Sequence, residues 1–83
     1  MIIELDRIRA QHKKAKAAFR EKKNWQFTGN ASKRDFFTEY EKEYNLKLVI
    51  PEWITHLGME YPRVVALEFD NEQDATWFML RWS

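Results

Sequence analysis

The clearest hydrophobic pattern lies in the last third of the chain, where an apolar run, a polar turn and an amphipathic segment follow one another. A strand inside a sheet is predicted over residues 63–69, because Val64, Val65, Ala66 and Leu67 form a β-favouring apolar run. Asp70 and Asn71 then offer side-chain oxygens that can cap a helix. The apolar positions that follow recur at i, i+3, i+4 and i+7 and are Ala75, Phe78, Met79 and Trp82. This spacing predicts a C-terminal helix that packs on the sheet.

Two further large side chains, Trp77 and Leu80, widen the apolar face of that helix. We therefore expect it to be covered on most sides. The favoured interpretation of the aromatic positions is core packing. The alternative is that Trp77 or Trp82 projects and anchors a partner, because tryptophan is enriched at binding hot spots.

The N-terminal quarter predicts a long helix over residues 3–23, because it lacks Gly and Pro and is rich in helix-favouring residues. Its apolar positions advance in steps of four and three and form one narrow seam of Met1, Leu5, Ile8, His12, Ala15 and Phe19. A narrow seam suits docking on the sheet of the same domain. The alternative is a homodimer through Leu5, Ile8 and Phe19.

The middle of the chain predicts one more helix and two short strands. A helix over 33–44 has an inner face of Phe36, Phe37, Tyr40 and Tyr44. A strand over 46–50 ends at Pro51, which cannot donate to a sheet ladder. Alternation over 53–57 predicts another strand, and Gly58 then marks a turn.

These elements predict an α+β fold with two N-terminal helices, a short antiparallel three-stranded meander and a C-terminal apolar helix packed on the sheet. A ferredoxin-like variant is the alternative. The 83 residues suffice for a single small domain, in which the basic helix 3–23 joins a core α+β unit over 31–83. Without cysteine, the core depends on thirteen aromatic side chains. The apolar runs are too short to cross a bilayer and no signal peptide is evident, so we expect no membrane association and a cytoplasmic location.

Positive and negative charges are unevenly distributed along the chain, although its net charge is only +1. Residues 1–23 carry a charge of +5, and residues 24–83 carry −4. The basic helix face is open to three interpretations: a solvated surface, a site for an acidic protein, or a site for nucleic-acid phosphates. Trp25 and Phe27, just after this helix, can stack bases if exposed or close the core. The candidate contact residues are Arg9, Lys13, Lys16 and Arg20, with Trp25 as an apolar anchor.

Chemical motifs argue against catalysis. The two histidines, His12 and His56, are far apart in sequence, and neither serine, Ser32 or Ser83, lies in a nucleophile motif. No cysteine, acidic calcium loop or glycine-rich phosphate loop is present. We therefore predict no enzyme activity, no metal and no cofactor.

The last twenty residues carry two resemblances. A strand that ends in Phe69, an acidic turn with Asp74-Ala75 and the aromatic-rich end 78–82 resemble the C-terminal segment of small uncharacterised proteins of tailed bacteriophages. That resemblance implies an accessory protein that modulates a host factor or belongs to the particle, in the host cytoplasm if viral. The same strand and helix resemble part of an RNA-recognition motif, but the two base-stacking positions fall on Val64 and Ala66, which carry no ring.

Taken together, the sequence predicts a small non-enzymatic protein-interaction module that binds a partner with an acidic surface through its basic helix. A phage accessory protein that modulates a host or phage protein fits this prediction. The alternative is a nucleic-acid-binding protein that places the same helix on phosphates.

Overall fold

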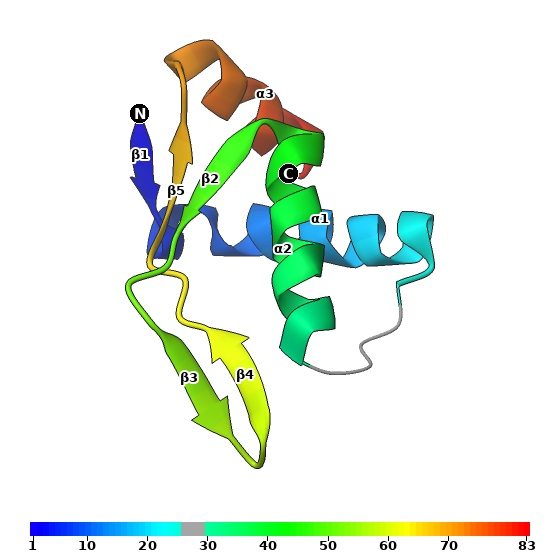
Figure 1. Ribbon diagram of the computed structural model, residues 1–83. Helices are drawn as coiled ribbons and strands as arrows, with labels where there is room; N and C mark the ends of the chain where they lie inside the picture. Colours follow the sequence, from blue (N-terminus) through cyan, green and yellow to red (C-terminus); the bar gives the residue numbers. More distant parts are fainter. Residues whose placement is uncertain (26–29) are drawn as a thin grey trace.

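The computed structural model describes residues 1–25 and 30–83, and these form three helices and five strands (Figure 1). In chain order the elements are β1 (Ile2–Glu4), α1 (Leu5–Lys23), α2 (Asn30–Tyr44), β2 (Leu46–Val49), β3 (Trp53–His56), β4 (Met59–Pro62), β5 (Ala66–Phe69) and α3 (Glu72–Arg81). The α+β class is confirmed. The helices and strands, however, are arranged differently from the predicted meander.

The main sheet has the strand order β1-β5-β2, and both pairings are antiparallel. Leu67 at its centre pairs with Ile3 on one side and Leu48 on the other, and it is fully buried. The predicted meander through residues 53–57 is therefore wrong, because β2 pairs directly with β5 and the N-terminus supplies the third strand. A ferredoxin-like variant is also wrong, since that fold interleaves its helices with the strands of a single sheet.

The first helix begins at Leu5, and the prediction that it starts at residue 3 is wrong. Ile2 and Ile3 point to opposite sides of β1, with exposed fractions of 61% and 5%. Two consecutive β-branched residues favour an extended edge strand over a helix start. A strand of three residues is too short to interrupt a helical pattern visibly, and this explains the error.

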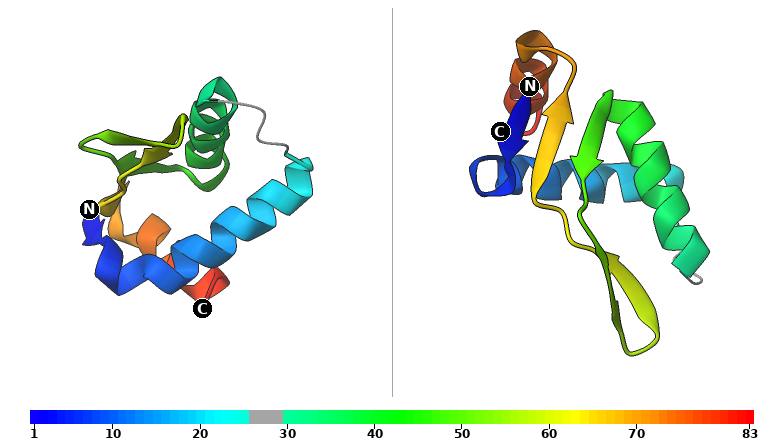
Figure 2. Two further views of the ribbon diagram at one scale, coloured as in Figure 1. Left: turned by 90° about the horizontal axis from the view of Figure 1, so that it is seen from below. Right: turned by 60° about the vertical axis from the view of Figure 1, so that its left-hand side comes forward.

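Residues 53–62 form a separate hairpin, in which β3 pairs with β4. The turn between them consists of Leu57 and Gly58, which both have positive φ angles, 53° and 76°. Two positive φ angles in a two-residue loop match the twist of the flanking strands. The strand β4 was not predicted, because Pro62 and the absence of β-branched residues mask it. Figure 2 shows the hairpin extending away from the rest of the molecule.

The core lies where α1 crosses the main sheet and meets α2 (Figures 1 and 2). The seam of α1 faces this core, where its buried side chains are Ile8, His12, Ala15 and Phe19. From α2, Phe36 and Tyr40 pack against Phe19 with ring centroids 5.4 and 6.0 Å away. The seam thus docks within its own domain, as predicted. Dimerisation as such stays a prediction, but Ile8 and Phe19 are buried within a single chain.

The C-terminal helix α3 packs on β5 and α1 through one face only. The side chain of Asn71 accepts a hydrogen bond from the Asp74 N–H at 2.9 Å, so the predicted cap is confirmed. Phe78 is buried, as the core interpretation requires, whereas Trp77 and Leu80 are each 67% exposed. The expectation that α3 is covered on most sides is therefore wrong. No helix within residues 1–25 and 30–83 combines the length and apolar character that crossing a bilayer requires.

Candidate functional site: a basic cleft

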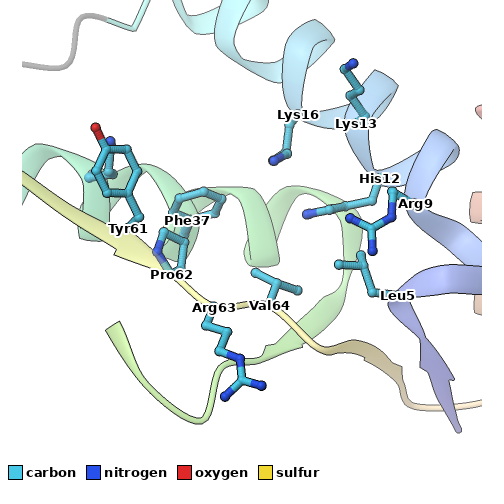
Figure 3. A pocket seen from close by; sticks show the side chains of 11 residues that line it. Leu5, Arg9, His12, Lys13, Lys16, Phe37, Tyr61, Pro62, Arg63 and Val64 are labelled. Atoms are coloured by element: carbon cyan, nitrogen blue, oxygen red, sulfur yellow. The ribbon is translucent and has the colours of Figure 1, made fainter. Parts of the chain in front are cut away.

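A cleft of about 640 Å³ opens between α1, the start of α2 and the segment that joins β4 to β5 (Figure 3). The side chains that line it fall into two groups. Five are basic: Arg9, Lys13, Lys16, Lys33 and Arg63. The others include the apolar or aromatic Leu5, Phe37, Tyr61 and Val64. We call this site the basic cleft. Its volume lies within the range of ordinary ligand sites, roughly 300–1,000 Å³.

Helix periodicity explains why α1 contributes three of the five cations. Arg9, Lys13 and Lys16 stand at i, i+4 and i+7, so they occupy one helix face beside the buried seam. Lys33, in the first turns of α2, and Arg63, just after β4, come from distant parts of the sequence. Figure 3 shows the α1 side chains on one side and Tyr61, Pro62 and Arg63 across from them. The fold therefore concentrates positive charge that the sequence disperses.

Two of the five cations of the cleft have an acidic partner outside it. Arg9 pairs with Asp6 at 3.0 Å and Arg63 with Glu52 at 3.1 Å, but both pairs are largely exposed and contribute little. No Asp or Glu is among the lining residues from the described parts of the chain. Burial, followed by the neighbouring Lys13, lowers the pKa of Lys16 below its usual value. A bound anion would favour the charged form of Lys16 and so offset both effects.

Aromatic rings lie among these cations. The Lys33 Nζ sits 3.8 Å from the centroid of the Tyr61 ring, and the Lys16 Nζ lies 6.0 Å from the Phe37 ring. Such contacts hold a cation beside a ring with a modest gain in energy, about 0.5–1 kcal/mol at exposed sites. They position the ammonium groups but leave them charged.

His12 lies against the cleft and is only 4% exposed. Its Nδ1 is 2.9 Å from the Tyr40 hydroxyl, whereas its Nε2 is buried and has no hydrogen-bond partner among the described residues. Burial, with a smaller contribution from Lys16, lowers the pKa of His12 to about 4. The imidazole is therefore neutral at pH 7.

The structure brings together three of the five predicted contact residues. Arg9, Lys13 and Lys16 line the basic cleft, whereas Arg20 and Trp25 do not. Arg20 is exposed in the last turn of α1. Trp25 is half-buried, and its ring packs on Phe36 with centroids 5.6 Å apart, so it helps to close the core. Phe27, predicted together with Trp25 as a base-stacking candidate, lies outside the described residues.

Sequence reasoning missed four polar residues of the cleft, His12, Lys33, Tyr61 and Arg63, as well as its apolar lining. His12 was assigned to the helix seam, which is where its backbone lies, but its ring also borders the cleft. Lys33 and Arg63 are thirty residues apart and carried no local motif. Only the packing of α2 and the β4–β5 segment against α1 brings them together.

An exposed apolar surface adjoins the cleft. On the hairpin, Tyr61 pairs with Ile54, and Met59 pairs with His56, so these side chains share one face of the two strands. Leu57 at the tip is 90% exposed. We call Ile54, Leu57, Met59 and Tyr61 the hairpin face. Tyr61 belongs both to this face and to the basic cleft.

Within residues 1–25 and 30–83, no group of three or more His, Asp or Glu side chains is placed to hold a metal. Comparison of the chain with protein-family models, curated proteins and solved structures found no match. The resemblance to phage proteins, the absence of catalysis and the identity of any partner therefore stay predictions.

Proposed function

We propose that the protein is a small non-enzymatic interaction module whose basic cleft binds an acidic segment of another protein. The observation that carries this proposal is the cleft itself, where five basic side chains from three separate parts of the chain meet with no acid among the lining residues. Complementary charge across an interface speeds association and selects among partners.

The shape of the site supports a peptide-like ligand over duplex nucleic acid. A duplex presents its phosphates on a convex surface, whereas these cations line a cleft between α1 and the β4–β5 segment. A single extended segment with acidic side chains can enter such a cleft. Its carboxylates then reach Lys13 and Lys16 from one side and Lys33 from the other.

The hairpin face also supports a protein partner. Ile54 and Leu57 are 48% and 90% exposed. Aliphatic side chains of this kind bind neither bases nor phosphates well, so they add little to a nucleic-acid interface. Ile54 and Leu57 can instead pack against apolar side chains of a protein segment. Those side chains would be buried next to the contacts that the acidic residues of the segment make. The preferred ligand is thus an acidic segment that also carries apolar residues. In a phage, this would be a host or phage protein that the module modulates in the cytoplasm.

Single-stranded nucleic acid is the second candidate, favoured by one observation. Tyr61 is 42% exposed at the mouth of the cleft and is flanked by Lys33, an arrangement that suits a base stacked beside its phosphate.

Binding to two labelled probes of equal length tests the proposal. One is a glutamate-rich peptide with interspersed leucines, and the other is a single-stranded DNA oligonucleotide; fluorescence anisotropy at several salt concentrations gives each Kd. Lys13→Glu reverses a charge in the cleft, and Lys14→Glu makes the same change on an exposed part of α1 that does not line the cleft. We expect the peptide to bind more tightly and Lys13→Glu to weaken it about tenfold, with Lys14→Glu close to wild type.

Three results would contradict the proposal. Equal losses from Lys13→Glu and Lys14→Glu would show that only the net charge of α1 matters. DNA binding that exceeds peptide binding and falls steeply with salt would favour the second candidate. Failure of the peptide to bind at low salt would remove the acidic partner altogether.

A further inference from the structure

The imidazole of His12 is an unusual member of the cleft, because it is a buried polar group with one unused nitrogen. Its Nε2 has no hydrogen-bond partner among residues 1–25 and 30–83, although the residue is only 4% exposed. Figure 3 shows the ring extending from α1 into the space between Lys16 and Val64. Because Nε2 is buried, an oxygen of a ligand reaches it from the cleft only when a covering side chain such as Lys16 moves aside.

The hydrogen bond to Tyr40 decides which nitrogen carries the proton. If Nδ1 donated to the Tyr40 oxygen at 2.9 Å, both the tyrosine proton and the Nε2 lone pair would be buried without partners. If the Tyr40 hydroxyl donates to Nδ1 instead, only the Nε2 hydrogen lacks a partner. Buried polar groups are satisfied wherever possible, so the second arrangement is favoured. His12 then presents an Nε2–H donor.

We propose that His12 is the central hydrogen-bond donor of an oxyanion site in the basic cleft, where its Nε2–H binds one carboxylate or phosphate oxygen. This inference rests on the proposed function and assigns a position to one anionic group of the partner. Figure 3 shows Arg9 and Lys16 of α1 near the His12 ring, and Lys13, Lys33 and Arg63 also line the cleft. The rigid Nε2–H donor fixes where the oxygen of the anion lies. Flexible ammonium groups alone attract the anion but do not fix its position.

The chemistry of the site selects an anion for two reasons. A cation is repelled by five positive side chains. A neutral acceptor would satisfy Nε2–H but would leave the partly buried Lys16 ammonium uncompensated. An oxyanion accepts the hydrogen bond from Nε2–H and also compensates the charge of the Lys16 ammonium. A dianion such as phosphate brings more negative charge to the site than a carboxylate does.

The test is a titration of the wild-type protein with inorganic phosphate and, separately, with acetate at equal ionic strength. Long-range nitrogen–proton NMR spectra report both imidazoles, and the exposed His56 serves as the internal control because the chain has only two histidines. In the free protein, we expect His12 to show the Nε2–H tautomer. Phosphate should shift the His12 signals saturably and leave those of His56 in place. A response to acetate as well would assign the site to oxyanions in general, whereas a response to phosphate alone would assign it to dianions.

Two substitutions of His12 test whether the N–H donor, and not the bulk of the ring, is needed for anion binding. His12→Gln keeps an N–H group near the position of Nε2, and His12→Leu removes it at similar volume. Phosphate binding, followed through the backbone amide of Lys16, should weaken about tenfold in His12→Leu, as expected for the loss of one charge-assisted hydrogen bond. In His12→Gln it should stay within about threefold of wild type.

The results distinguish this inference from the proposed function. A His12 signal that does not move while the glutamate-rich peptide binds would overturn the inference and leave the proposed function standing. A saturable His12 response together with failure of the peptide to bind would support the oxyanion site and overturn the protein-partner proposal. A His12 that starts as the Nδ1–H tautomer would also overturn the inference, because Nε2 would then be an acceptor.

Discussion

At the scale of single residues, burial of His12 makes stability depend on pH. A histidine in the unfolded chain takes up a proton near pH 6.5, but His12 does so only at about 4 in the folded protein. Between these values the unfolded state binds more protons, so the free energy of unfolding falls as the pH drops from 6.5 to 4. The loss amounts to at most about 3 kcal/mol. Urea unfolding at a series of pH values measures it.

The control for this pH effect is His12→Gln, which does not titrate. Acidic side chains such as Glu43, whose pKa is lowered by its hydrogen bond with Lys22, also make stability depend on pH in acid. They are present in both proteins, so the difference between wild type and His12→Gln isolates His12. Parallel stability curves for the two proteins would show that His12 is not kept neutral by burial.

The turn residue Leu57 presents a second case at this scale. It has a φ of 53°, which costs most L-residues roughly 1–2 kcal/mol, and its side chain is 90% exposed. Asn tolerates this conformation, and Asn-Gly is the preferred pair for such turns. Leu57→Asn should therefore raise the free energy of unfolding by up to about 1 kcal/mol in urea denaturation.

The same substitution should weaken binding of the leucine-containing acidic peptide, because it removes the most exposed apolar side chain of the hairpin face. A leucine in a strained conformation at an exposed tip adds little to stability, which is consistent with a role of its side chain in the proposed binding. If Leu57→Asn stabilised the protein and left peptide binding unchanged, the hairpin face would have no part in the interface.

At the scale of elements, the short strand β1 is held by one of its two isoleucines. Ile3 is 5% exposed and lies opposite Leu67, whereas Ile2 on the other side of the strand is 61% exposed. Ile3→Ala should lower the free energy of unfolding by about 2–4 kcal/mol, and Ile2→Ala by less than about 1 kcal/mol. Chemical denaturation of the two variants compares them directly. Similar losses would indicate that β1 does not pair with β5 as described.

The three helices and the strands β2, β3 and β5 were predicted from the sequence, whereas β1 and β4 were not. The seam of α1 repeats over about four turns and the inner face of α2 over about two and a half, so both helices were predicted close to their observed bounds. The strand β1 has three residues, too few to show a period, and β4 is masked by Pro62 and by the absence of β-branched residues. Their pairing depends on contacts between distant segments, such as Ile3 with Leu67, and no local pattern reveals it.

The candidate site was likewise predictable only in the part that lies on one regular helix. Arg9, Lys13 and Lys16 share a helix face, and this follows from spacing alone. Trp25 was chosen because it is aromatic and follows the basic run, yet its contact with Phe36 places it at the edge of the core. The opposite wall of the cleft, with Lys33 and Arg63, arises only when α2 and the β4–β5 segment pack near α1.

At the scale of the whole molecule, the charge asymmetry persists after folding. The acidic remainder of the chain compensates the cleft only in part: Glu52 pairs with Arg63, whereas the ion pair between Lys22 and Glu43 joins α1 to α2 away from the residues that line the cleft. The opposite wall adds Lys33 and Arg63, both from the part of the sequence with a net charge of −4. Folding thus sharpens a positive surface on a protein that is nearly neutral overall, which suits electrostatic steering of an acidic partner.

The position of Ile8 leads to a prediction about the assembly of the whole molecule. Ile8 is fully buried within one chain, so Ile8→Glu places an unpaired carboxylate in the core and should cost more than about 4 kcal/mol. A domain of this size has little more stability than that, and we expect the variant to unfold. Circular dichroism detects the lost structure, and sedimentation gives the mass.

Lys14→Glu introduces the same side chain at an exposed position of the same helix and should stay folded. If Ile8→Glu instead stayed folded and halved the mass of a wild-type dimer, the seam would be an interface between two copies, and the core described here would need α1 in another place.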